Sequence, residues 1–583
     1  MLFRSYTLAA DISGVGSIRQ WAGNTTLSGN SSAFAGTTEV SGGTLTVNGS
    51  LGGSLLIDSG ATLSGSGSVG TTTVSAGGVI APNAPGSTLT VNGNFTLESG
   101  ALYVVQASNT AADRITVNGN AALAGDLSIQ AASSEYNARV RYTILSATGL
   151  VSGNFDSIAS DFAFVTPVVS YTSDEVYLTL NPNGVGYADV SRTSNQASVA
   201  NVLNAAALNS ATSEAFNQVL LRIDTLSAGQ AQTAFESMSG RAHLGLSSLG
   251  LLSSTLQNVG RFSFASGGVS GGSGFSGLSD GALMVAANEA RDTMTDVSGG
   301  LGLSLRPVRQ RLLWAQAVGG HGNARSDGNA PGYKSNSGGV LMGADMEVSQ
   351  HLALGVAYQF SDTRLKYDSL GDTAAAQGHQ LSVYGRYAVD DWRIKAIAGY
   401  GWNNYDTHRD IIIGSDVTRA RAKYDGRELG VFLEAAYRIE QGTYAIEPVL
   451  SVQNVVLHQD GFQEKGAGVL GLSAGSRTSR SLVSMLGGRL QRALGDAGLT
   501  GEVRAFWSRQ WADRGSDVDL AFQGVPGATY RVSGLKQERD SAVIGFGVAG
   551  NPTAPLTLQL DYNLGVDKRE TQHTLIAGLK YRW

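Results

Sequence analysis

From about Leu312 to Trp583 the chain alternates apolar residues with polar or small ones at every second position. Between Leu556 and Gly565, leucine or tyrosine fills every even position, and each odd position is polar or small. A strand needs this period of two when its two faces meet different environments. A soluble sheet alternates in the same way, so the pattern predicts strands but does not by itself predict a membrane.

The links between these strands alternate in length. Five are short: Glu347 to His351, Val389 to Trp392, Glu440 to Thr443, Leu494 to Leu499 and Gly550 to Leu556. Five are longer and polar: Gly322 to Tyr333, Tyr367 to Gly378, Thr407 to Asp425, Gln459 to Arg480 and Arg514 to Arg531. Outer-membrane barrels have short periplasmic turns and long outer loops, and an even strand number. We therefore expect about twelve strands, with both barrel ends on the periplasmic side.

The chain stops on a strand. One face of this last stretch carries Leu575, Ala577, Leu579, Tyr581 and Trp583. An aromatic residue at the last outward position is typical of the aromatic girdle at a membrane interface. We therefore predict that the C-terminal half forms a β-barrel in an outer membrane.

Five short motifs occur in order along this half of the chain. They are Leu313-Trp314-Ala315-Gln316, Gly343-Ala344-Asp345, Leu352 to Tyr358, Ile446-Glu447-Pro448 and Tyr581-Arg582-Trp583. In order and spacing they resemble the C-terminal translocator of bacterial autotransporters, the monomeric type V secretion proteins. The resemblance implies an all-β fold: a transmembrane antiparallel β-barrel of about twelve strands with a pore helix, preceded by a right-handed parallel β-helix passenger fragment.

The resemblance also implies the activity and the partners. The barrel would secrete its own N-terminal passenger and display it on the cell surface. Its partners would be outer-membrane lipid, the barrel-assembly machinery, periplasmic chaperones and the passenger polypeptide in the pore. Two alternatives stay open for the passenger: a surface adhesin, or the end of a secreted protease or esterase whose catalytic domain lies upstream.

The composition of the chain excludes several kinds of function and site. The net charge of −6 and pI near 5.7 give no basic footprint for nucleic acid. The chain has no cysteine, which excludes disulfides and thiolate metal sites. Residues 1–10 lack the apolar core of a signal peptide, so we expect the chain to be the C-terminal portion of a longer product.

Residues 1–110 repeat a short strand-like unit followed by Gly, Asn or Ser. The unit occurs at Gly43 to Gly49 and Ser87 to Gly93, and it recurs just past this range at Arg114 to Gly119. Short strands at rung-like spacing predict a parallel β-helix, with a low-complexity Gly/Ser/Thr segment as the alternative. Residues 111–185 hold denser apolar strands and would cap the open end of the helix; they resemble the autochaperone segment of autotransporter passengers.

We predict that residues 186–302 form a helical tether and that residues 303–583 form the barrel. The passenger must lie outside while both barrel ends face the periplasm, so the tether has to cross the lumen. A crossing of ~30 Å needs about 20 helical residues. We expect this pore helix at about 241–261, with Leu283 to Val297 as the runner-up and Gly267 to Gly281 as a flexible linker.

No catalytic, cofactor-binding or metal-binding residue is predicted, and no cofactor. The G-x-S-x-G matches at Ser270, Ser279 and Ser473 lack the strand-to-helix context of a hydrolase nucleophile. Gly545, Gly547 and Gly550 match a dinucleotide fingerprint, but inside a predicted strand, where small residues make room. The seven histidines are scattered without metal-ligand spacing, and any catalytic domain is expected to be absent from this chain.

The predicted lumen carries charges of both signs. Either they keep a watery lumen solvated or they contact a transiting chain. The predicted lumen-facing residues are Arg386, Arg393, Lys395, Arg438, Lys580, Arg582, Glu434, Glu447, Glu502 and Asp561.

Overall fold

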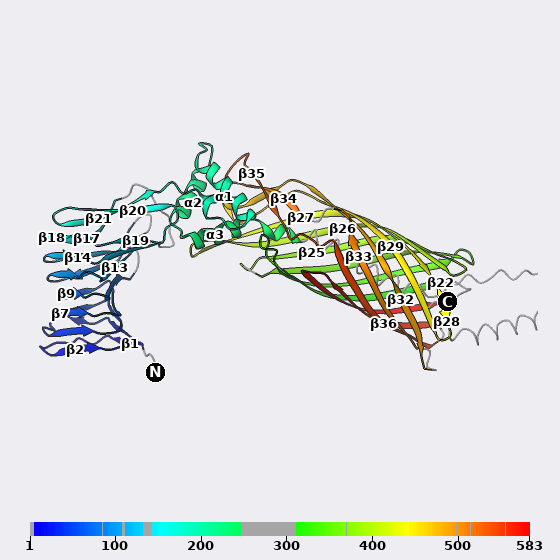
Figure 1. The fold of residues 1–583 in the computed structure, drawn as a ribbon, viewed down its shortest axis with the longest axis horizontal. Coiled ribbons are helices and arrows are strands. Elements are labelled where there is room, and N and C mark those ends of the chain that lie inside the picture. Colours follow the sequence, from blue (N-terminus) through cyan, green and yellow to red (C-terminus); the bar gives the residue numbers. More distant parts are fainter. Residues whose placement is uncertain are drawn as a thin grey trace, which may run out of the picture. The chain divides into compact units, whose positions relative to one another are not determined.

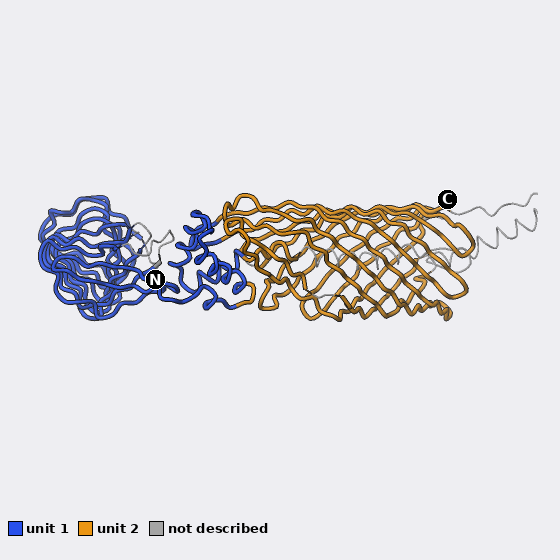
Figure 2. The backbone as a smooth tube through the Cα atoms, turned by 90° about the horizontal axis from the view of Figure 1, so that it is seen from above, with its two compact units in different colours: residues 1–192, 196–238, 412–417 blue, residues 193–195, 239–411, 418–583 orange. Residues whose placement is uncertain are grey.

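A computed structural model describes residues 5–83, 86–107, 111–131, 141–245, 311–368, 370–495, 499–512, 515–553 and 555–583. Two compact units divide the chain (Figures 1 and 2). One comprises residues 1–192, 196–238 and 412–417; the other comprises residues 193–195, 239–411 and 418–583. Among the described residues, no helix is both long and apolar enough to cross a bilayer.

The N-terminal unit is a β-solenoid with two long sheets of mainly parallel strands (Figure 1). The first sheet contains β1 (Ser5–Leu8), β3 (Asn24–Leu27), β6 (Gly43–Val47), β8 (Ala61–Gly65), β10 (Val79–Pro82), β13 (Leu102–Ala107), β16 (Asp126–Ala131) and β19 (Ile158–Ser160). The second contains β2 (Ser17–Gln20), β4 (Asn30–Ser31), β5 (Thr37–Val40), β7 (Ser50–Ile57), β9 (Ser68–Val74), β11 (Thr88–Val91), β12 (Phe95–Leu97), β14 (Arg114–Val117), β15 (Ala121–Leu123), β17 (Arg141–Ala147), β18 (Val151–Gly153), β20 (Val165–Tyr171) and β21 (Glu175–Pro182).

Stacked aliphatic side chains hold the rungs together. Val40, Ile57, Val74, Leu97 and Leu123 follow one another in register across the second sheet, and all five are buried. Burial of each such side chain stabilises the fold by about 1.5–3 kcal/mol. The predicted β-helix is confirmed in preference to a low-complexity segment.

The repeat copies do not all occupy equivalent positions. Leu89 of β11 stacks on Ile115 of β14 in the second sheet, whereas Leu45 of β6 pairs with Leu63 of β8 in the first. The two sheets share one strand chemistry, so sequence similarity alone did not separate them. Parallel stacking also continues past residue 110, where the cap was expected to begin. Among the strand pairs described in the solenoid, β17–β21 and β20–β21 are the antiparallel ones.

Short helices follow the solenoid: η1 (Tyr187–Val190), α1 (Ser194–Ala207), α2 (Glu214–Asp224), α3 (Ala228–Met238) and η2 (Arg241–His243). The side chain of Ser213 caps α2, which buries Phe216, Val219, Leu220 and Ile223 along one stripe. Of the expected pore helix at 241–261, the structure describes only residues 241–245, whose first three form a 3₁₀ turn. The rest of that helix, its runner-up and the linker lie outside the described residues.

Twelve long antiparallel strands close into a barrel, as predicted (Figure 1). They are β22 (Arg311–Ala324), β23 (Tyr333–Glu347), β24 (Leu352–Tyr367), β25 (Thr373–Val389), β26 (Trp392–Ile413), β27 (Asp416–Tyr437), β29 (Tyr444–Gln459), β32 (Arg477–Leu494), β33 (Leu499–Gln510), β36 (Asp540–Thr553), β37 (Leu556–Val566) and β38 (Glu570–Arg582). The last strand, β38, pairs with the first, β22, and the seam places Tyr581 opposite Leu313.

Shorter elements complete this unit. β28 (Ile439–Gln441) pairs with β29. β30 (Phe462–Gln463), β31 (Leu472–Ala474), β34 (Asp517–Phe522) and β35 (Thr529–Ser533) form a separate four-stranded sheet, and η3 (Gly468–Leu470) lies between β30 and β31. We call the barrel end that is opposite to Arg311 and Trp583 the outer end.

The outward faces of the strands carry the apolar residues predicted to meet lipid. Leu354, Val356, Leu558, Leu560 and Leu575 are all exposed, and their neighbours in sequence point inward. An exposed apolar face of this extent on every strand is typical of a transmembrane barrel. The lipid-facing alternation is therefore confirmed.

Two of the predicted long loops are wrong. A loop was predicted at Thr407 to Asp425, but β26 and β27 continue through it and are joined by two residues, Gly414-Ser415. A loop was also predicted at Tyr367 to Gly378, but the connection comprises only residues 368–372. Beyond the lipid, the outward face meets water and becomes polar, while the inward face turns apolar. The strands thus continue with their polarity reversed, and the polar outward positions looked like loop residues.

Candidate functional site in the barrel interior

Charged side chains inside the barrel form ion pairs at the membrane level. The carboxylate of Glu434 accepts hydrogen bonds from Lys395 Nζ at 3.0 Å and from Arg489 Nη2 at 2.5 Å. Glu447 extends the network by accepting from Arg438 Nη1 at 3.1 Å. Because a buried charge is costly unless paired, this network explains how polar residues occupy so closed an interior.

A second cluster centres on Arg504, which is almost fully buried. Its Nη1 lies 2.7 Å from Glu502 Oε1 and 3.0 Å from Asp561 Oδ1. A Cβ atom on Gly545 would lie 2.4 Å from Arg504 Nε, and one on Gly547 would lie 2.3 Å from Asp561 Oδ1. Gly545 and Gly547 thus make room for the cluster, as expected for small residues inside the barrel.

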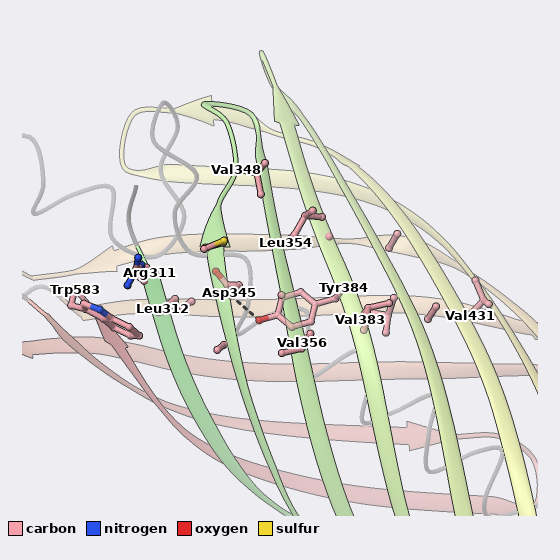
Figure 3. A pocket seen from close by; sticks show the side chains of 17 residues that line it. Arg311, Leu312, Asp345, Val348, Leu354, Val356, Val383, Tyr384, Val431 and Trp583 are labelled. Carbon is pink, nitrogen blue, oxygen red and sulfur yellow. Dashed lines mark hydrogen bonds between the residues drawn. The ribbon is translucent and has the colours of Figure 1, made fainter. Parts of the chain in front are cut away.

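A third cluster lies beside the barrel seam. Trp314 Nε1 donates to the hydroxyl of Tyr384 at 2.7 Å, and that hydroxyl donates to Asp345 Oδ2 at 2.7 Å. Arg386 Nη2 completes the chain by donating to Asp345 Oδ1 at 2.6 Å. Figure 3 shows the bond between Tyr384 and Asp345 at a largely apolar groove, about 970 Å³ in volume, that runs from Trp583 to Val431.

The predicted lumen-facing charges therefore point inward, and most of them are paired. Lys395, Glu434, Glu502 and Asp561 are buried, whereas Arg393 and Arg582 are only half-buried. No group of three or more histidine or acidic residues in the described part of the chain could hold a metal ion. Ser473 lies in β31 and not in a strand-to-helix turn, whereas Ser270 and Ser279 lie outside the described residues.

The outer end of the barrel has an apolar interior. Tyr333, Leu365, Tyr367, Tyr405 and Tyr424 point inward from four strands and pack into one buried cluster. Ala242 of η2 belongs to the same cluster, and η2 packs against β25. The chain segment just before residue 246 is thus held inside the barrel.

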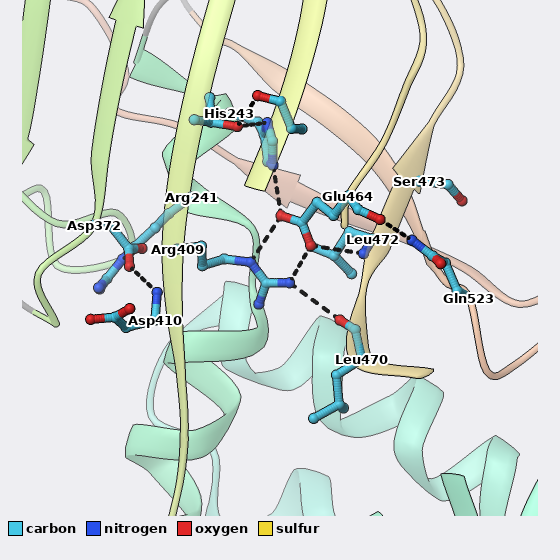
Figure 4. A network of polar contacts seen from close by, with 12 residues as sticks. Arg241, His243, Asp372, Arg409, Asp410, Glu464, Leu470, Leu472, Ser473 and Gln523 are labelled. Carbon is cyan, nitrogen blue, oxygen red and sulfur yellow. Dashed lines mark hydrogen bonds and ion pairs between the residues drawn. The ribbon is translucent and has the colours of Figure 1, made fainter. Parts of the chain in front are cut away.

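Polar contacts fix this segment on two sides, and we call residues 239–245 with their barrel partners the outer-end anchor (Figure 4). Arg241 Nε donates to Asp372 Oδ2 at 2.8 Å, and both side chains are buried. Arg477 Nη2 donates to the carbonyl oxygen of His243 at 2.6 Å. The amide of Gly245 donates to the hydroxyl of Tyr367 at 3.1 Å.

Glu464 is the hub of the anchor. Its carboxylate contacts His243 Nε2 at 2.9 Å and accepts from Arg409 Nη2 at 2.6 Å and from the amide of Leu472 at 2.8 Å. Burial raises the pKa of Glu464, but Arg409 and His243 more than offset this and hold the pKa well below its usual range. Burial lowers the pKa of His243, so the ring is neutral and donates through Nε2. The ring also stacks on Phe462, with 4.0 Å between the two ring centroids.

Reasoning from the sequence missed this anchor. His243 and Glu464 are 221 positions apart. The histidines were expected on the surface or in the lumen, and His243 lies inside the barrel, where it is fully buried within the anchor. The local sign of the anchor in the sequence is the pair Arg241 and His243, which lies in a stretch of otherwise small and apolar residues.

Comparison with known proteins agrees with the architecture. The family model described as "Autotransporter beta-domain" matches residues 313–563. An "Extracellular serine protease" of Serratia marcescens is 26% identical over 98% of this chain and 56% of its own length. "Outer membrane protein A" of Rickettsia rickettsii is 25% identical over 43% of this chain and 12% of its own length. The chain thus spans about half the length of the serine protease.

Two solved structures are similar to part of this chain. The "Translocator domain of autotransporter NalP from Neisseria meningitidis" is 19% identical, with a TM-score of 0.39, and covers 52% of this chain and 98% of its own. The β domain of the Bordetella autotransporter Brka is 18% identical, with a TM-score of 0.35, and covers 46% of this chain and 98% of its own.

Proposed function

The C-terminal part of this chain is an autotransporter β-domain in the outer membrane, and on this premise we propose that the barrel secretes its own N-terminal β-helix and displays it on the cell surface. The outer-end anchor carries the proposal. Arg241 and His243 follow the solenoid in sequence, and they are buried against Asp372 and Glu464 at the end of the barrel that faces outward. A segment that leads from the passenger is held where an exported chain would leave the barrel.

The passenger fragment is proposed to act by display and not by catalysis. The described solenoid interior is packed with aliphatic side chains, and its outer faces carry mainly Ser, Thr and Asn. A serine protease is among the relatives, but this chain spans only 56% of that protein. Any catalytic domain would therefore belong to the part that this chain does not span, which is the second candidate function.

Assembly is proposed to depend on the barrel-assembly machinery and on periplasmic chaperones. The feature for the machinery to recognise is β38, because this strand closes the seam, carries Tyr581 on the lipid face and is followed directly by the exposed Trp583. An amphipathic strand that must stay unpaired until closure also needs protection from aggregation in the periplasm.

Deletion of residues 581–583 in cells tests the proposal. The chain, expressed with an export signal, should place protease-sensitive β-helix on intact cells, and the deletion should leave the protein in the periplasm. As a matched control, Lys568→Gln changes an exposed connection and should leave display unchanged. Normal surface display by the truncated protein would contradict the role of β38.

A further inference from the structure

We propose that the outer face of β23 and β24 binds the phosphate groups of an anionic glycolipid in the outer leaflet of the membrane. The surface consists of Lys334, Arg364 and Lys366, and we call it the β23–β24 basic cluster. All three side chains are exposed. None of them takes part in the lumen network or in the outer-end anchor.

Inward packing fixes the direction of these side chains. Tyr333, Leu365 and Tyr367 are buried in the apolar cluster at the outer end. Because successive side chains of a strand point to opposite faces, Lys334, Arg364 and Lys366 must point outward. The cluster is thus held on the membrane side of a rigid wall.

The level of the cluster follows from the aromatic girdle. Phe360, His379 and Trp402 are directly opposite one another on three neighbouring strands and point outward, which marks the edge of the hydrocarbon. Arg364 lies four residues beyond Phe360 and Lys366 six, which is roughly 10 Å and 15 Å above that edge for a strand tilted by ~40°. A phospholipid headgroup layer is only ~5–8 Å deep. A sugar-bearing headgroup therefore fits this level better.

The charges of the cluster call for an anion. Lys334 is directly opposite Lys366, and like charges at such positions destabilise a sheet. Among the described residues, no carboxylate lies within ion-pair distance of either lysine. The nearest acidic positions on this face are Asp362, which pairs with Arg364 at 3.2 Å, and the exposed Asp368.

The usual reason for lysine on an exposed strand does not apply. Lysine often protects the edge of an open sheet from aggregation. The barrel is closed and β23 and β24 are both paired on two sides, so there is no edge to protect. A phosphate between Lys334 and Lys366 would relieve their repulsion through charge-assisted hydrogen bonds.

Thermal unfolding of the purified full chain in detergent tests the proposal. The folded barrel is detected by its different mobility from unfolded protein on an SDS gel run in the cold. Phosphorylated lipopolysaccharide should raise the midpoint, and its dephosphorylated form should not. The double variant K334Q/K366Q should need roughly tenfold more glycolipid for the same rise, because each charge near a membrane surface contributes to binding. Without lipid, this variant should be at least as stable as the original, which checks that it folds.

The control variant R311Q/R492Q removes the same charge from exposed residues at the opposite end of the barrel, and it should respond like the original chain. Three results would overturn the proposal. The double variant could respond like the original, the control could lose the response equally, or vesicles of phosphatidylglycerol could give the same rise, which would indicate a plain lipid anion.

Discussion

Replacement of Glu464 by Gln tests the outer-end anchor most sharply among single changes. The Glu464 carboxylate neutralises Arg409, and both side chains are about 1% exposed. Without the negative charge, Arg409 stays buried and loses its ion pair with Glu464. Removal of one member of a buried ion pair typically costs about 3–5 kcal/mol. We expect a loss of that size in the free energy of unfolding of the barrel, measured by urea titration in detergent.

The matched control is Asp519→Asn, whose partner Arg531 lies at 2.8 Å but in a pair that is more than half exposed. Exposed pairs contribute about 0–1 kcal/mol, so this variant should unfold almost like the original. Adding Arg409→Gln to Glu464→Gln should recover much of the loss, because no uncompensated cation remains. Equal losses for Glu464→Gln and Asp519→Asn would refute the assignment of Glu464 as the hub.

Two further predictions concern the lipid face and the solenoid. Leu560→Arg should cost about 2–4 kcal/mol of barrel stability, whereas Gln559→Arg, on the inward face, should be tolerated; equal effects on heat-resistant folding would contradict the facing assignment. Burial raises the pKa of Asp113 from 3.8 to about 7, so the folded solenoid binds the proton more tightly than the unfolded chain, and its stability should fall as pH rises from about 4 to about 7. Asp113→Asn should abolish this fall in urea titrations of the solenoid followed by circular dichroism, and an unchanged pH dependence would show that another group is responsible.

The barrel could be predicted from sequence because lipid imposes a simple rule on every strand. Leu558 and Leu560 must be apolar, and the residues between them need not be, so a period of two appears directly. The seam of β22 with β38 followed from closure. The solenoid was also predictable, because each rung repeats the same buried aliphatic positions.

The outer end could not be predicted for the converse reason. Beyond the lipid, Tyr405 points inward and Asp406 outward, and this reversed polarity gives no apolar outward signal to follow. The outer-end anchor joins His243, Arg409 and Glu464 from three distant parts of the chain. Each of these residues looks like an ordinary surface residue until tertiary packing buries it.

Crosslinking on intact cells tests the central claim most directly, because the chain has no natural cysteine. Ala242→Cys and Ala374→Cys place thiols within one buried cluster at the outer end. The distant control pair is Ala242→Cys with Ala353→Cys. Ala353 points inward on β24, about twelve residues from Leu365, and Leu365 is opposite Ala374. The distance along the strand from the level of Ala374 to Ala353 is therefore roughly 40 Å. If residues 239–245 are held at the outer end after export, a short bismaleimide should join the first pair in protein whose β-helix is exposed on the surface, and it should leave the control pair unjoined. Surface-exposed β-helix with no crosslink in the first pair, or with equal crosslinking in both, would contradict the account.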